Sequence, residues 1–74
     1  MNELTELLQS IRPEIDFTQS NLAENGVLDS MDIMLIVDGI SQHYNIQINP
    51  LDIVPEYFDS VSAMYELLQK YINH

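Results

Sequence analysis

The chain has 74 residues, and its twelve acidic residues against a single arginine and a single lysine give a formal net charge of −10. A chain of this length predicts one domain, residues 1–74, that buries roughly 60% of the surface exposed when it is unfolded. The lack of cysteine excludes disulfides and thiolate metal sites, so the chain supplies no thiol of its own. The shortage of cations excludes nucleic acid as a direct ligand and favours partners with basic surfaces.

The hydropathy of the chain and its first residues indicate where in the cell the protein is expected. The longest uninterrupted apolar run, from Ile33 to Val37, is too short to span a membrane. The N-terminus lacks the basic start of a signal peptide. We therefore expect a cytoplasmic protein without membrane insertion.

The first predicted element is a helix that ends at Arg12 and Pro13, because a proline disfavours helical backbone at the residue before it. Its apolar stripe at helical spacing consists of Leu4, Leu7, Leu8 and Ile11. A long connection without periodicity then runs from Pro13 to Leu28, which indicates a loop that is either functional or tightly packed. Its expected anchors in the core are Ile15, Phe17, Leu22, Val27 and Leu28.

The second predicted helix begins at Ser30 and ends at Tyr44. Asp29 is a preferred N-cap residue, and Asn45 can adopt the left-handed conformation that ends a helix. Ser30 is then in the first helical turn, with its hydroxyl near the positive end of the helix dipole. This place suits a phosphate ester.

Residues 33–37 are apolar on every face of this helix, which is unusual for a surface helix. The expected core face consists of Ile33, Ile36, Val37, Ile40 and Tyr44. Met31, Met34 and Leu35 cannot all join that face. We therefore expect an exposed apolar patch beside Ser30, and such patches tend to mark binding surfaces.

The remaining residues predict an extended loop and two further helices. Ile46 to Ile48 alternate as in a strand, but without a second strand we predict a loop. A short third helix is predicted from Pro50 to Phe58. Pro55 is compatible with the first position of a helix. Asp59 or Ser60 caps the last helix. Its stripe consists of Val61, Met64, Tyr65, Leu68, Tyr71 and Ile72.

The segment Leu28-Asp29-Ser30-Met31-Asp32 resembles the Asp-Ser-Leu signature of acyl and peptidyl carrier proteins, with methionine in place of leucine. Two further features extend the resemblance over nearly the whole chain. The second helix closes on an aromatic before an extended segment, and residues 55–61 resemble the junction of the third and fourth helices in stand-alone carriers. The resemblance implies an all-α, acyl-carrier-protein-like four-helix bundle. It has three main helices, a short third helix and a long loop between helices 1 and 2.

The same resemblance implies a function. A phosphopantetheinyl transferase would attach 4′-phosphopantetheine from coenzyme A covalently to Ser30, and the thiol of this arm would carry an acyl or aminoacyl group as a thioester. The chain itself would not be an enzyme. Asp29, Met31, Met34 and Asp38 would form the docking face. Its partners would be the transferase, a loading ligase or synthetase, and a downstream transferase or synthase with basic docking surfaces.

One difference from the family pattern concerns the kind of biosynthetic pathway in which the carrier would work. Carriers of fatty acid synthesis usually have a heavily acidic second helix, whereas this one has Leu35, Ser41 and Gln42 beside only Asp32 and Asp38. The apolar face is more similar to that of peptidyl or aminoacyl carriers. This favours a dedicated carrier in a specialised biosynthetic pathway, whose cargo the sequence does not specify.

Other interpretations remain open at this point. Ser30 could be an ordinary capping or surface serine in a small acidic helical module that binds a protein and is never modified. For Asp32, packing and a solvated surface position are equally compatible with the sequence. A hydrolase is disfavoured, because there is no Gly-x-Ser-x-Gly motif and neither His43 nor His74 is placed as a base. No metal site is expected, since the acidic clusters lack the glycine and terminal glutamate of a calcium loop.

Overall fold

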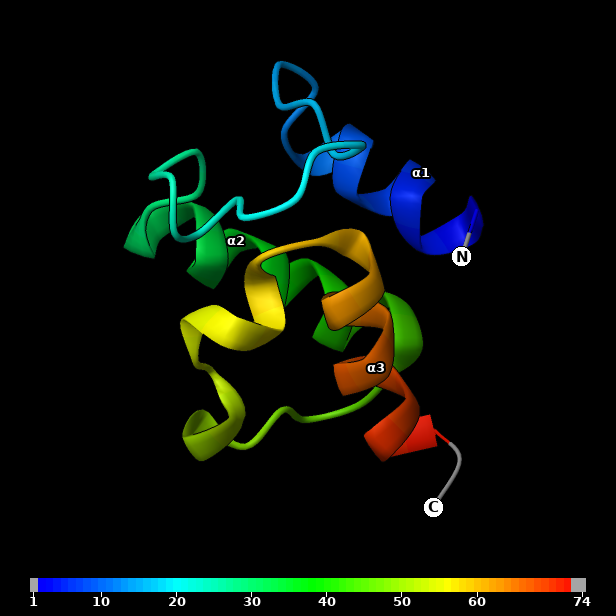
Figure 1. The fold of residues 1–74 in the computed structure, drawn as a ribbon. Coiled ribbons are helices and arrows are strands. Elements are labelled where there is room, and N and C mark those ends of the chain that lie inside the picture. Colours follow the sequence, from blue (N-terminus) through cyan, green and yellow to red (C-terminus); the bar gives the residue numbers. More distant parts are fainter. Residues whose placement is uncertain (1, 73–74) are drawn as a thin grey trace.

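The computed structural model describes residues 2–72, which form three α-helices packed together within 30 × 24 × 19 Å. The helices are α1 (Asn2–Ile11), α2 (Ser30–Tyr44) and α3 (Val61–Ile72), and two short 3₁₀ turns, η1 (Pro50–Asp52) and η2 (Pro55–Phe58), lie between α2 and α3 (Figure 1). No strand occurs in this range, which confirms the all-α prediction. None of the helices described is long and apolar enough to cross a membrane.

The core lies where the inner faces of the three helices meet. In α2 the predicted face is confirmed: Ile36 and Ile40 are fully buried, while Ile33, Val37 and Tyr44 pack at the core edge. A glycine in the middle of this helix brings α1 close, since a Cβ at Gly39 would lie 2.5 Å from Ile11 Cδ1. The buried apolar side chains are Leu4, Leu8, Ile15, Phe17, Leu22, Leu28, Ile36, Ile40, Ile48, Phe58, Met64, Leu67 and Leu68.

The buried face of α3 is wider than the predicted stripe. Leu67, which the prediction omitted, is buried, whereas Ile72 at the end of the stripe is exposed. The helix packs against both α1 and η2. Leu67 is three residues from Met64 and adjacent to Leu68, so the buried apolar surface extends beyond the predicted stripe to Leu67.

The prediction of a single short helix from Pro50 to Phe58 is wrong in detail. The segment forms two 3₁₀ turns separated by Ile53 and Val54, and Val54 is extended, with φ −125° and ψ 151°. Pro55 explains the break, because a proline lacks an N–H group and pushes the preceding residue out of the helical region. Pro55 begins η2, as expected.

The long connection between α1 and α2 is anchored by four of its five predicted core residues. Val27 is the exception, with 38% of its surface exposed. The N–H group of Leu28 donates a hydrogen bond to the Leu22 carbonyl at 3.0 Å, which closes the loop just before α2. Leu28 is buried next to Leu22 in this closed loop, and its neighbour Val27 is left at the surface.

A single acidic residue ties this connection to the start of α3. The backbone carbonyl of Asp59 accepts a hydrogen bond from Leu22 N–H at 2.8 Å, and its Oδ1 accepts from Ala23 N–H at 3.1 Å and Glu24 N–H at 3.0 Å. The α3 cap is Ser60, whose hydroxyl accepts from a backbone N–H of the first turn at 3.1 Å. Of the two residues predicted to cap this helix, Ser60 is the cap and Asp59 holds the distant loop.

Candidate functional site

Ser30 is the first residue of α2, and its side chain is exposed. Its hydroxyl forms no hydrogen bond with any other described residue. The preceding residue, Asp29, has the extended backbone of an N-cap, with φ −96° and ψ −176°. The hydroxyl therefore lies in solvent at the end of a helix where unpaired N–H groups and the helix dipole favour a negatively charged substituent.

Two reciprocal hydrogen bonds hold this helix start. Asp29 Oδ1 accepts from Asp32 N–H at 2.9 Å, and Asp32 Oδ2 accepts from Asp29 N–H at 3.3 Å. This is a capping box, in which each aspartate side chain accepts a hydrogen bond from the backbone N–H group of the other residue. Without these bonds the helix start would leave both N–H groups unpaired. Because both residues flank Ser30, the capping box fixes the backbone that carries the serine.

The two carboxylates of the capping box have different surroundings. The side chain of Asp32 is only 7% exposed and forms an ion pair with the guanidinium of Arg12, at the end of α1. This settles the open question about Asp32 in favour of packing. Arg12, which also pairs with the exposed Glu14, compensates this charge, and Asp29 is left as the exposed carboxylate beside Ser30. In the described part of the chain, no third acidic or histidine side chain joins this pair to form a potential metal site.

The apolar patch expected beside Ser30 is present. Met31, Met34 and Leu35 are 72%, 59% and 45% exposed. Asp38 is exposed as well and accepts a hydrogen bond from Gln42 Nε2 at 3.0 Å. Met31, Met34 and Asp38 are spaced by three and four residues and therefore share one helix face. Asp29, at the N-cap beside Ser30, is exposed as well.

A hollow of about 280 Å³ lies directly beside Ser30. One wall is α2, with Ser30, Ile33 and Met34, and the other wall is the segment from Ile53 to Pro55, which joins η1 to the first residue of η2. The lining is apolar apart from the serine hydroxyl. Sequence reasoning missed the second wall, because its residues are about twenty positions further along the chain and carry no local signal.

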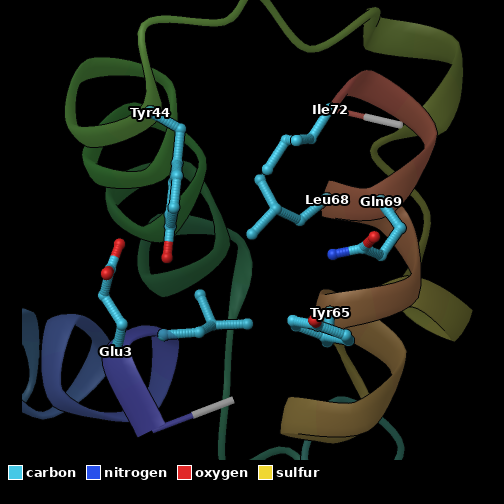
Figure 2. A pocket seen from close by; sticks show the side chains of 7 residues that line it. Glu3, Tyr44, Tyr65, Leu68, Gln69 and Ile72 are labelled. Carbon is cyan, nitrogen blue, oxygen red and sulfur yellow. The ribbon is translucent and has the colours of Figure 1, made fainter. Parts of the chain in front are cut away.

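A second hollow, of about 260 Å³, lies at the other end of α2 (Figure 2). Burial raises the pKa of Tyr44 in this hollow, and a hydrogen bond to Glu3 raises it further. Ser30 is about 20 Å away, since an α-helix rises about 1.5 Å per residue. The side chains around this hollow come from all three helices: Glu3, Leu4, Tyr44, Tyr65, Leu68, Gln69 and Ile72.

His43 is not part of the Ser30 site. It belongs to the opposite end of α2, where its Nε2 lies 3.2 Å from Glu3 Oε2. The other histidine, His74, lies outside the described residues. Within residues 2–72, the geometry brings no histidine to Ser30 that could activate its hydroxyl as a nucleophile.

Comparison with known families agrees with this geometry. The profile of the family described as the phosphopantetheine attachment site matches residues 2–68, from the start of α1 into α3. Searches among curated proteins and among solved structures returned no significant match. The residues fit the group that this family carries, because Ser30 is exposed at a helix N-terminus beside an apolar hollow. The chain therefore belongs to the phosphopantetheine attachment family and is a non-catalytic carrier protein whose cofactor is covalently bound 4′-phosphopantetheine.

Proposed function

We propose that Ser30 is the residue to which the arm is attached. The observation that carries this proposal is the contrast between two serines at helix starts. The hydroxyl of Ser60 is half-buried and accepts a hydrogen bond from Ala63 N–H as the cap of α3. The hydroxyl of Ser30 is not needed as a cap, because Asp29 performs that role in α2. Ser30 is thus exposed and available to an incoming enzyme.

The attachment reaction transfers a phosphoryl-linked group from coenzyme A. Ser30 Oγ forms a bond to the phosphorus that bears the pantetheine, the bond from that phosphorus to the bridging pyrophosphate oxygen breaks, and 3′,5′-ADP leaves. The hydroxyl proton passes to a base of the transferase. The product is a phosphodiester with one negative charge at the N-terminus of α2, which the helix dipole stabilises by about 0.3–1 kcal/mol.

Other residues near Ser30 orient the site and neutralise charge. The capping box holds the first turn, and Arg12 compensates Asp32, so that only Asp29 presents an exposed charge next to the serine. We infer that this carboxylate faces the metal ion of the bound transferase. Once in place, the thiol of the arm carries an acyl or aminoacyl cargo as a thioester.

Intact mass measurement tests the attachment residue. The chain is incubated with coenzyme A and a phosphopantetheinyl transferase of broad specificity, alongside Ser30→Ala and the control Ser60→Ala. We expect one phosphopantetheine on the wild type and on Ser60→Ala, and none on Ser30→Ala. Modification of Ser30→Ala would overturn the proposal by showing that the arm is attached elsewhere, and no modification of the wild type would overturn it in favour of the unmodified interaction module.

We also propose that Asp29, Met31, Met34 and Asp38 form the docking face for partner enzymes. Met31, Met34 and Asp38 are exposed on one side of α2, and Asp29 is exposed at its N-cap next to Ser30, which supports this role. The face has as many methionines as aspartates and is thus not heavily acidic, which supports a dedicated carrier in a specialised pathway. The partners are then a loading ligase or synthetase and a downstream transferase or synthase, with basic residues around an apolar contact.

Substitution of Met34 tests the docking face. Met34→Glu should lower kcat/KM of the transfer reaction by about tenfold, which corresponds to about 1.4 kcal/mol. Stability should change by about 0.5 kcal/mol or less, because the side chain is exposed. The control Ser62→Glu adds the same charge at an exposed position of α3 and should leave transfer unchanged. Equal transfer rates for both variants would contradict the assignment.

A further inference from the structure

The two walls of the hollow beside Ser30 are held in different ways. The α2 wall is part of a regular helix, whereas the opposite wall, Ile53 to Pro55, runs from the end of one 3₁₀ turn to the first residue of the next. The backbone N–H groups of this wall bond to carbonyls only a few residues before them. Ile53 N–H donates to Pro50 O at 3.1 Å, and Val54 N–H donates to Asp52 O at 3.0 Å. None of these bonds reaches α2. Side chains must therefore set the distance between the two walls.

The side chains that hold this segment form a polar cluster with the end of α3. The Tyr71 hydroxyl donates to Asp52 Oδ2 at 2.6 Å and accepts from Asn49 N–H at 2.9 Å. Lys70 Nζ donates to Asp52 Oδ1 at 3.1 Å. We call these four residues, Asn49, Asp52, Lys70 and Tyr71, the Asp52 clamp.

Lys70 also reaches the other side of the wall. Its Nζ donates to the Tyr57 hydroxyl at 3.2 Å and lies 5.1 Å from the centre of the Tyr57 ring. Asp52 and Tyr57 bracket the Ile53–Pro55 wall in the sequence, so one ammonium group bonds to the residues on both sides of it. The hydrogen bond from Tyr71 and then that from Lys70 lower the pKa of Asp52. The carboxylate is therefore charged at neutral pH, and the ion pair is present.

We propose that the Asp52 clamp positions the Ile53–Pro55 wall so that the hollow holds the first part of the attached arm. This proposal rests on attachment at Ser30. In phosphopantetheine, a carbon that bears two methyl groups lies one carbon from the phosphate ester, so it is the first apolar group that the hollow meets. Ile33, Ile53 and Val54 line the hollow with branched apolar side chains that suit it. The clamp is outside the hollow and acts through the wall, not by touching the arm.

Amide NMR spectra of the apo and modified chains test this placement. In the wild type, modification should shift the amide signals of Ile53 and Val54 as well as that of Met31, next to the attachment residue. Tyr71→Phe removes the one hydroxyl that bonds to both Asp52 and Asn49. In this variant the shifts at Ile53 and Val54 should fall to about half or less, while the shift at Met31 persists.

Two further variants make the test specific. Tyr65→Phe removes a hydroxyl from the same helix, but at the second hollow (Figure 2), and should behave as the wild type. Lys70→Met removes the bonds to Asp52 and Tyr57 at an exposed position that does not support the core, so it should fold and reproduce the effect of Tyr71→Phe. Lys70→Arg, which keeps the charge, should restore the wild-type shifts.

The outcomes separate this proposal from the one on which it rests. A wild type that is modified without any shift at Ile53 and Val54 would overturn the placement of the arm. Equal shifts in the wild type, Tyr71→Phe and Lys70→Met would overturn the role of the clamp. A wild type that accepts no phosphopantetheine at all would instead refute the proposed attachment at Ser30.

Discussion

The two connections between the helices are held by different kinds of interaction. The first, residues 12–29, buries Ile15, Phe17, Leu22 and Leu28 in the core, and its N–H groups bond to Asp59, two residues before α3. The second, residues 45–60, is buried near its two ends by Ile48 and Phe58. Its middle is held at the end of α3 by the polar side chains of the Asp52 clamp.

This difference separates global stability from local geometry. The first connection leads directly into the capping box and Ser30, so the backbone of the site is as firmly held as the core itself. The second connection provides the far wall of the hollow, and that wall depends on solvent-accessible hydrogen bonds and one ion pair. Perturbing the buried residues of the first connection should therefore unfold the protein more readily, whereas perturbing the middle of the second connection should change the hollow and leave the fold in place.

The largest expected effect is in the first connection. Leu22→Ala should lower the free energy of unfolding by about 2–5 kcal/mol, because Leu22 is fully buried and its truncation leaves a cavity. Val27→Ala, in the same loop, should cost about 0.5 kcal/mol or less, since Val27 is exposed. Urea denaturation monitored by circular dichroism measures both. Equal losses would contradict the structural difference between these two residues.

A smaller loss is expected when the link to α3 is removed. Asp59→Ala deprives the N–H groups of Ala23 and Glu24 of their acceptor, which should cost about 1–3 kcal/mol. Asp59→Asn keeps an oxygen that can accept the same hydrogen bonds and should cost less. The two variants are compared by the same urea titration. If Asn proved as damaging as Ala, the charge of Asp59 would matter more than its bonds to the loop.

The smallest effect on stability should come from the clamp, and it depends on pH. The pKa of Asp52 is below its ordinary value of 3.8, so its contribution is present above that pH and is lost as the pH falls through the lowered pKa. Hydrogen bonds to the Tyr57 hydroxyl and then to Asp52 raise the pKa of Lys70 above 10.5. Its contribution is therefore full below pH 10.5 and is lost as the pH rises through the raised pKa.

Thermal melts of the wild type and Asp52→Asn across the pH range check this prediction. The difference in Tm between the two chains should be constant from about pH 4 to about pH 10 and should shrink beyond both limits. It should be modest, because exposed ion pairs contribute little. A Tm difference that disappears between pH 7 and pH 5 would show that the carboxylate of Asp52 does not have a lowered pKa.

The sequence by itself determined the features that depend on neighbouring residues. Apolar residues three and four positions apart place the inner faces of the helices, because those positions meet on one side of a helix. Asp29 caps α2, Asn45 ends it in the left-handed conformation, and Pro55 begins η2, as each residue's own backbone and side-chain chemistry dictates. The exposure of Met31 and Met34 follows equally, since an all-apolar helix turn cannot bury every side.

Only the tertiary structure decided what depends on contacts between distant parts of the chain. Asp32 is buried where Arg12, the residue after α1, reaches it and pairs with its charge. The hollow beside Ser30 exists because the Ile53–Pro55 segment is held opposite α2 by residues near the end of α3. These pairings join residues about twenty positions apart, and no local periodicity or capping preference encodes them. These pairings form only when the helices pack, because a polar group that becomes buried is stable only with a hydrogen-bond or ion-pair partner.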